Sequence, residues 1–201
     1  MNTAIGTDIL TATDFLKAGE LVAIPTETVY GLAANALNED AVLKIYAAKN
    51  RPQFNPLIIH VASFEQAKQY IKDISVEAEQ LAAAFWPGPL TMLFNKQQNV
   101  PDLVTAGSKR VAVRVPNHPL SIQLLSQLNF PVAAPSANPS GYVSPTTAQH
   151  VYEGLHNKIP YILDGGACGV GVESTIVGWN ENNELEPVSY THLTLPTNRE
   201  V

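Results

Sequence analysis

The feature that most constrains the fold is the alternation of short apolar runs with segments of helical periodicity. Seven runs are short, partly β-branched and bounded by Pro or Gly, as strands are, and they occupy residues 21–25, 56–61, 90–94, 111–115, 131–135, 161–164 and 175–179. Helical patterns separate most of them, at residues 10–18, 39–49, 76–86, 118–128 and 146–155. This order predicts an α/β fold in which helices flank one twisted sheet of about seven strands. The pattern leaves strand direction open, and we expect a mixed sheet.

The length of the chain suits one well-filled domain. It has 201 residues, of which 45% are hydrophobic and 15% charged, and we expect this domain to occupy residues 1–187. No apolar run approaches the roughly 18 residues that a membrane helix needs, and the N-terminus lacks the basic-then-apolar order of a signal peptide. We therefore expect a cytoplasmic protein without a membrane partner.

The last residues, 188–201, do not continue the alternation of strands and helices. They read VSYTHLTLPTNREV, which resembles a translated sequencing-adapter read-through, and we expect a non-native tail there. A genuine C-terminal strand through Tyr190 and Leu193 is the alternative. A non-native tail would imply that the natural protein has been cut short.

Scarce arginines indicate an anionic ligand. The formal net charge of −6 argues against a surface built mainly to bind nucleic acid. Before the tail the arginines are Arg51, Arg110 and Arg114, in segments that look like loops or strand ends. A guanidinium group suits carboxylate and phosphate, although an ordinary surface ion pair would explain any one of the three about as well. Because loop side chains contribute little to a core, we expect alanine at Arg51 or Arg114 to leave the fold intact.

Polar or glycine-rich segments recur where strands and helices are expected to end. They read PTETVYGL, KNRPQFNP, WPGPLT, PNHP, PSANPSGYVSPT and GGACGVGVES. Each has a structural explanation on its own, because Pro-Gly-Pro forms a turn, Gly adopts positive φ, and Ser or Thr caps a helix. All of them together indicate a ligand site, since α/β proteins bind ligands at strand ends. Their hydroxyls and amides suit phosphate, although no GxxxxGK[ST] motif occurs.

Several single residues have competing interpretations. Alternation places His60 on the same strand face as Ile58, near the end of the run, although a lone strand histidine is more often a core residue. Lys49 follows a helical pattern, where a cation also suits the helix dipole. Glu27 either orients its neighbours or caps a turn. The lone Cys168 can form no internal disulfide, and we interpret it as a small residue in a glycine-rich loop.

As a set, the motifs resemble those of the YrdC-like threonylcarbamoyl-AMP synthases. PTETVYGL, KNRP with NPL, WPGPLT, VAVRVPNHP, PSANPSG with SPT, and DGG with ESTIV occur in the family's order over roughly residues 8–180. The resemblance implies an α/β fold with a deep, positively lined central cavity. It also implies a nucleotidyltransferase that forms threonylcarbamoyl-AMP and pyrophosphate from L-threonine, bicarbonate or CO2, and ATP. A tRNA threonylcarbamoyl transferase complex would then use the product to make threonylcarbamoyladenosine in tRNA, while direct tRNA binding stays open.

The resemblance implies roles for residues at matching positions. L-threonine would be bound by Thr28, His60, Arg114, Ser174 and, through its backbone, Ala134. ATP would be bound by Arg51, Asn55, Arg110, Ser136 and Ser144. Lys49 and Arg51 are the catalytic candidates, and loss of either Arg51 or Arg114 is expected to remove most of the activity. Mg2+ would be held by the phosphates of ATP and by water, without a protein ligand.

The end of the chain departs from the family pattern. The family continues past the last strand with a basic ILRPG-like segment whose arginine helps to bind ATP, and here the chain reads ELEP. Longer members also carry a linker and a small C-terminal domain. The start of this chain resembles the longer members, so the chain could correspond to their synthase domain alone. Whether the arginine and the domain are missing, and whether the chain is fully active, stays open.

Two other functions fit parts of the sequence. The main alternative is a non-catalytic RNA- or nucleotide-binding module of the same fold, although the acidic balance and the lack of a basic, aromatic-rich face weigh against RNA. A serine hydrolase using Ser136 or Ser174 is disfavoured, since neither lies in a GxSxG motif and no His–Asp pair is evident.

Overall fold

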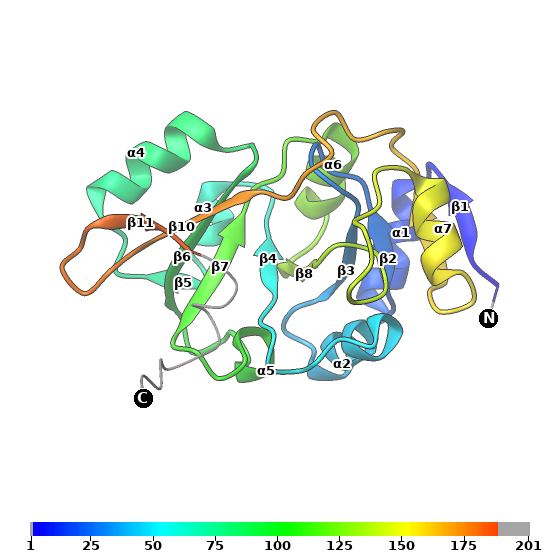
Figure 1. The fold of residues 1–201 in the computed structure, drawn as a ribbon, viewed down its shortest axis with the longest axis horizontal. Coiled ribbons are helices and arrows are strands. Elements are labelled where there is room, and N and C mark those ends of the chain that lie inside the picture. Colours follow the sequence, from blue (N-terminus) through cyan, green and yellow to red (C-terminus); the bar gives the residue numbers. More distant parts are fainter. Residues whose placement is uncertain (1, 189–201) are drawn as a thin grey trace.

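A computed structural model of the chain describes residues 2–188 (Figure 1). Residue 1 and residues 189–201 lie outside the described part. The expected non-native tail falls almost wholly there, and so does the alternative strand through Tyr190 and Leu193. Both interpretations of that segment therefore stay predictions.

The described residues form one mixed sheet of eleven strands. The strands are β1 (Ala4–Gly6), β2 (Val22–Ile24), β3 (Gly31–Asn35), β4 (Ile58–His60), β5 (Ile71–Lys72), β6 (Leu90–Lys96), β7 (Arg110–Arg114), β8 (Val132–Ala133), β9 (Tyr161–Leu163), β10 (Thr175–Trp179) and β11 (Leu185–Pro187). Their order is β1-β9-β2-β3-β8-β4-β7-β6-β10-β11, and β5 pairs with β6. The α/β class and the mixed sheet are confirmed, but the expected number of about seven strands is too low.

The strands that were not predicted lack a readable pattern. β3 reads GLAAN, and Gly, Ala and Asn are depleted in strands. It is a strand because it pairs antiparallel with β2 on one side and with β8 on the other. β1, β5 and β11 have three residues or fewer and do not lie in longer apolar runs of the kind that predicted the equally short β2, β8 and β9.

The described helices are α1 (Ile9–Lys17), α2 (Glu39–Lys49), α3 (Phe64–Ala67), α4 (Val76–Phe85), α5 (Asp102–Thr105), α6 (Pro119–Ser126) and α7 (Ala148–Leu155). Polar side chains cap two of these helices: Asn38 accepts from the Ala41 amide at the start of α2, and Ser75 accepts from the Ala78 amide at the start of α4. α3 and α5, which the pattern did not predict, are single turns. Among the described helices, none is both long and apolar enough to cross a membrane.

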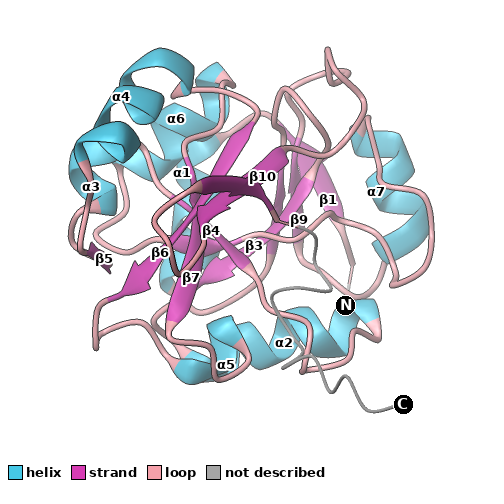
Figure 2. Ribbon diagram, turned by 60° about the vertical axis from the view of Figure 1, so that its left-hand side comes forward, coloured by secondary structure: helices cyan, strands magenta, loops and turns pink. Residues whose placement is uncertain are grey.

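Helices cover both faces of the β1–β9–β2–β3 part of the sheet (Figure 2). Val22 and Ile24 of β2 belong to a core cluster that includes residues of α1 and α6. Ala23, which points to the other face, belongs to a larger cluster that includes residues of α2 and α7. The alternation of this one strand therefore places its residues in two cores.

Strand β4, which β8 separates from β3, has one face in the larger core and the other toward a pocket. Leu57, Ile59 and Val61 join the larger core, on the face opposite to the one that alternation gave to Ile58 and His60. Ile58 and His60 point the other way and line a pocket. β4 runs parallel to β7, and the register sets His60 directly opposite Arg114. This pairing positions the candidate site.

Candidate functional site

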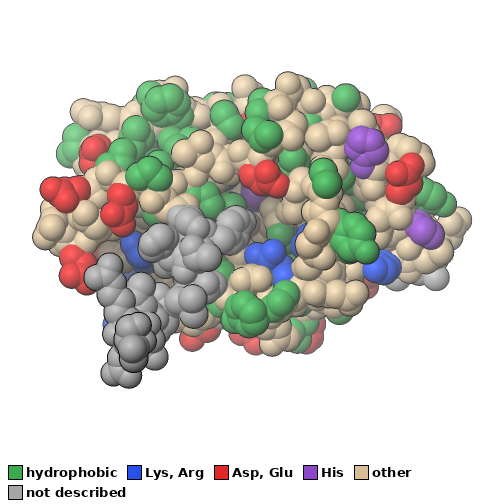
Figure 3. All heavy atoms as spheres, viewed as in Figure 1, with side chains coloured by type: hydrophobic (Ala, Val, Ile, Leu, Met, Phe, Trp, Pro, Cys, Tyr) green, Lys and Arg blue, Asp and Glu red, His purple; other side chains and the backbone are tan. Residues whose placement is uncertain are grey.

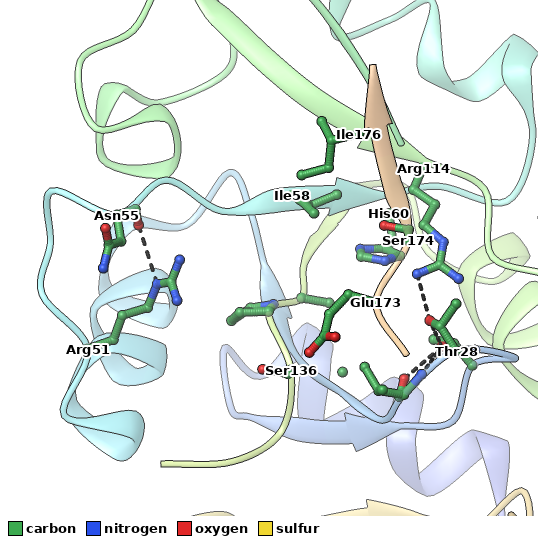
Figure 4. A pocket seen from close by; sticks show the side chains of 15 residues that line it. Thr28, Arg51, Asn55, Ile58, His60, Arg114, Ser136, Glu173, Ser174 and Ile176 are labelled. Atoms are coloured by element: carbon green, nitrogen blue, oxygen red, sulfur yellow. Dashed lines mark hydrogen bonds between the residues drawn. The ribbon is translucent and has the colours of Figure 1, made fainter. Parts of the chain in front are cut away.

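A pocket of about 230 Å³ opens beside β4, β7 and β10 (Figure 4). Its lining residues are Thr26, Thr28, Val29, Gly31, Arg51, Asn55, Ile58, His60, Arg114, Ala134, Pro135, Ser136, Glu173, Ser174 and Ile176. The face of the molecule drawn in Figure 3 carries few Lys and Arg side chains, and its acidic side chains are dispersed. The basic side chains that line the pocket, Arg51 and Arg114, therefore favour an anionic ligand there.

Most residues assigned from the sequence meet in this pocket. Those that line it are Thr28, Arg51, Asn55, His60, Arg114, Ala134, Ser136 and Ser174. Three others, Lys49, Arg110 and Ser144, are not among its lining residues. The ligand assigned to each of these residues stays a prediction.

Arg114 is a buried cation at the end of β7, with only 4% of its surface exposed. Its Nη1 donates to Thr28 Oγ1 at 2.9 Å, and its Nε donates to the Gly88 carbonyl at 3.2 Å. Its Nη2 lies 2.7 Å from Glu27 Oε1 in an ion pair. The expectation that this arginine contributes little to the fold is wrong, because removing one partner of a buried pair leaves the other charge desolvated.

The hydroxyls of PTETVYGL serve both the local turn and the pocket. Thr26 Oγ1 donates to the Val29 carbonyl at 2.6 Å and accepts from the Thr28 and Val29 amides, which closes a tight turn. Thr28 is fully buried, and its Oγ1 lies 2.9 Å from Thr26 Oγ1. The turn thereby holds the Thr28 hydroxyl against Arg114.

His60 is neutral under ordinary conditions. It is 3% exposed, and its Nδ1 has no hydrogen-bond partner among the described residues. Burial, together with the charge of Arg114, lowers the pKa of His60 to about 3. A neutral imidazole beside a cation can accept or donate a hydrogen bond to a ligand without adding charge.

This shifted pKa predicts a loss of stability in acid. In the unfolded chain a histidine binds a proton near pH 6.5, while in the folded chain His60 stays neutral down to about pH 3, so stability falls as the pH falls from 6.5. Between pH 7.5 and 5.0 we expect the free energy of unfolding to drop by about 2 kcal/mol more in the wild type than in a His60→Gln variant. Urea unfolding at both pH values measures this difference. An equal drop in both proteins would contradict it.

The other end of the pocket is built by the turn that follows α2. Asn50 ends this helix in the left-handed conformation, with φ of 50°, and so redirects the chain at Arg51. Arg51 Nη2 donates to the Pro56 carbonyl at 3.0 Å, and Nε donates to the Asn55 carbonyl at 3.4 Å. These bonds hold the half-buried guanidinium at the side of the pocket opposite Arg114 (Figure 4).

Lys49 lies behind the pocket wall and not in the pocket. It is 1% exposed, and its ammonium donates to the carbonyls of Ser136 and Asn138. Burial, together with nearby Arg51, lowers the pKa of Lys49 to about 7. The contacts favour a role in holding the loop at 136–138, and the catalytic assignment of Lys49 stays a prediction.

Ser174 and Ser144 lie on two loops that meet at Glu173. Ser174 Oγ lies 2.7 Å from the buried Thr91 hydroxyl of β6, which fixes the start of β10. Ser144 donates to Glu173 Oε1 and so touches a lining residue without lining the pocket itself.

Arg110 lies at the other end of β7 from Arg114. Its Nη1 donates to the Trp179 carbonyl at 3.3 Å. It lines a smaller depression that shares Ile58 with the pocket. The structure therefore places Arg110 near the pocket but does not bring it inside, and its assignment to ATP stays a prediction.

Sequence reasoning did not assign six side chains that line the pocket: Thr26, Val29, Ile58, Pro135, Glu173 and Ile176. Glu173 directly precedes the predicted Ser174, and alternation had already placed Ile58 on the face of His60. The sequence therefore held signals for both residues. They were not assigned because neither an apolar side chain nor a single carboxylate is expected in a site that binds anions. Ile58 and Ile176 give the pocket an apolar side, since both belong to a small buried cluster with Leu93.

Comparison with known proteins identifies the family. The Sua5/YciO/YrdC family model, described as telomere recombination, matches residues 14–187. The chain belongs to the Sua5/YciO/YrdC family. The resemblance noted in the sequence motifs is thereby confirmed.

Curated Sua5/YciO/YrdC relatives are similar over most of this chain. The threonylcarbamoyl-AMP synthase of Pyrococcus abyssi is 54% identical over 170 residues, which are 85% of this chain and 50% of the relative. The threonylcarbamoyl-AMP synthase of Bacillus subtilis is 49% identical over 170 residues, which are 84% of this chain and 49% of the relative. The chain therefore spans about half the length of these relatives.

A solved structure of the Sua5/YciO/YrdC family matches in three dimensions. The crystal structure of P. abyssi Sua5 complexed with L-threonine has a TM-score of 0.84 at 50% identity, covering 90% of this chain and 54% of that one. E. coli YciO shares the fold, with a TM-score of 0.77 at 19% identity, covering 96% of this chain and 98% of that one. These matches confirm the expected fold.

Proposed function

We propose that this chain is an L-threonylcarbamoyladenylate synthase, a nucleotidyltransferase acting on L-threonine, bicarbonate or CO2, and ATP. One observation carries the proposal: two arginines, Arg114 and Arg51, reach the same pocket from opposite sides. Two separate cationic groups suit a reaction that brings two anionic reactants together. The similarity to threonylcarbamoyl-AMP synthases over about half their length supports this reading.

The end around Arg114 is proposed to bind L-threonine. The guanidinium would pair with the amino acid carboxylate, and the hydroxyls of Thr28 and Ser174 would bind its polar groups. Neutral His60 would add a hydrogen bond without competing for the carboxylate charge. The related P. abyssi Sua5 structure is described as a complex with L-threonine, which supports this choice of ligand.

The end around Arg51 is proposed to bind ATP. Arg51, Asn55, Ser136 and Ser144 supply donors for phosphate, with Arg110 close by. Mg2+ would enter with ATP, held chiefly by its phosphates and water. Glu173 and Ser136 in the pocket lining are oxygen donors of the kind that this ion accepts, so the residues present are compatible with it.

The proposed reaction has two bond-forming steps. The neutral amine of threonine attacks the carbon of CO2 or bicarbonate and forms a carbamate. With CO2 a proton is released, whereas with bicarbonate water leaves and no net proton is released. A carbamate oxygen then attacks the α-phosphorus of ATP, and the bond to pyrophosphate breaks. Arg114 and Arg51 would offset the repulsion between the two anions, and holding them at reaction distance can contribute roughly 7–11 kcal/mol.

The product is proposed to serve tRNA modification in the cytoplasm. A carbamoyl group joined to a phosphate is a reactive mixed anhydride, so a second protein must accept it before water does. We propose a tRNA threonylcarbamoyl transferase complex as this acceptor.

The proposal predicts that the purified chain releases pyrophosphate from ATP only when L-threonine and bicarbonate are both present. A coupled pyrophosphate assay with each substrate omitted in turn measures this dependence. Pyrophosphate release without threonine would contradict the proposed reaction. Tight RNA binding without any pyrophosphate release would favour the alternative, a non-catalytic RNA-binding module.

A further inference from the structure

Glu27 has a contact with the site that the proposed reaction does not explain. Arg114 lines the pocket and Glu27 does not. Oε1 of Glu27 nevertheless lies 2.7 Å from Nη2 of Arg114. The two side chains are 13% and 5% exposed, so this is a buried ion pair next to the ligand cavity. We propose that Glu27 is a positioning residue, which holds Arg114 in the orientation that binds the amino acid carboxylate. This inference rests on the proposed function.

Glu27 completes a three-sided grip on the guanidinium. The Gly88 carbonyl binds Nε, the Thr28 hydroxyl binds Nη1, and Glu27 pairs with Nη2. A guanidinium group has five N–H donors in one plane, so the two hydrogen bonds and the ion pair together restrict how this plane can turn. Without Glu27, the Arg114 guanidinium would keep only its hydrogen bonds to Gly88 and Thr28 and could rotate about them.

Glu27 is itself held on two sides. Its Oε2 accepts from the Asn117 amide at 3.0 Å, just beyond β7. Its backbone carbonyl accepts from the Val170 amide at 2.8 Å, in the glycine-rich loop that leads to Ser174. Glu27 therefore ties together three segments that each supply a pocket residue: the opening motif, the end of β7 and the glycine-rich loop. This arrangement makes its carboxylate a rigid anchor.

The charge and the shape of Glu27 make separable contributions. A glutamine at this position keeps an oxygen that can accept from the Asn117 amide, so it would preserve a turn cap. It loses the negative charge, so Arg114 would be left without an ionic partner in a buried site. A Glu27→Gln variant therefore separates the positioning role from a purely local cap.

The experiment compares L-threonine binding by isothermal titration calorimetry in the wild type, Glu27→Gln, Arg114→Gln and the double variant. The Kd for threonine is expected to rise about tenfold or more in Glu27→Gln. In steady-state assays its KM for threonine should rise likewise, while its KM for ATP stays within about twofold. Because Glu27 acts through Arg114, the double variant should bind threonine no more weakly than Arg114→Gln alone.

A matched control removes the carboxylate of another ion pair. Glu20 pairs with Lys44 at 2.7 Å on a partly exposed surface, and Glu20→Gln should leave the Kd for threonine unchanged. Wild-type affinity in Glu27→Gln, or additive losses in the double variant, would overturn the inference. A wild-type chain that binds no threonine would instead overturn the proposed function.

Urea unfolding of the same four proteins tests whether Glu27 holds Arg114, without any need for threonine binding. If Glu27 holds Arg114, Glu27→Gln should be less stable than the double variant, in which neither buried charge remains. A double variant no more stable than Glu27→Gln would overturn the inference, even if the single variant fails to fold.

Discussion

Replacing Arg114 with alanine is expected to lower threonine-dependent pyrophosphate release by about 10²–10³-fold and the free energy of unfolding by about 3–5 kcal/mol. The first effect follows from the loss of the guanidinium proposed to bind the amino acid carboxylate. The second follows from the buried ion pair, because Glu27 would keep its charge at a desolvated position without a partner. Pyrophosphate assays and urea unfolding measure the two effects separately.

Lys44→Ala is the matched control for Arg114. Lys44 is also paired with a carboxylate, but its side chain is 42% exposed. Its loss should change the free energy of unfolding by less than about 1 kcal/mol and leave pyrophosphate release intact. An Arg114→Ala variant as stable as the Lys44→Ala variant would show that the buried pair adds nothing to the fold.

Replacing Lys49 with methionine is expected to weaken ATP binding and to lower the free energy of unfolding by about 2–5 kcal/mol. Methionine fills much of the same volume but leaves the carbonyls of Ser136 and Asn138 without their donor. The loop would then move, and the Ser136 hydroxyl with it. Calorimetric titration with ATP and urea unfolding test both expectations.

The same variant decides between the two roles of Lys49. A catalytic ammonium would leave the Kd for ATP unchanged and reduce only turnover, whereas a loop anchor would raise the Kd as well. The control is Lys17→Met, an identical substitution at an exposed position in the last turn of α1, which should change neither quantity. Unchanged ATP affinity and stability in Lys49→Met would rule out the anchor.

Much of the site could be predicted from the sequence because it depends on local patterns. Alternation along residues 56–61 separated the core positions from Ile58 and His60. The polar junctions identified strand and helix ends, and four of the six junctions contribute residues to one pocket: PTETVYGL, KNRPQFNP, PSANPSGYVSPT and GGACGVGVES. The helix starts that Asn38 and Ser75 cap are also local features, because a cap involves residues only three positions apart.

The remaining features depend on contacts between distant parts of the chain. Glu27 and Arg114 meet only because the chain between them forms β4 and β7, and no local pattern encodes that pairing. The burial of Arg114 was missed for the same reason, since an arginine at a strand end looks exposed. β3 was missed because its small residues acquire strand structure from neighbours on both sides.

The two ends of the pocket differ in how deeply they are buried. This difference bears on the order in which ligands can bind. Thr28, His60 and Arg114 are 0%, 3% and 4% exposed, whereas Arg51 and Asn55 at the other end are half-buried. A molecule seated on the three buried residues lies beneath whatever occupies the outer end. Under the proposed function, we therefore expect L-threonine to bind before ATP, and the adenylate to leave after pyrophosphate.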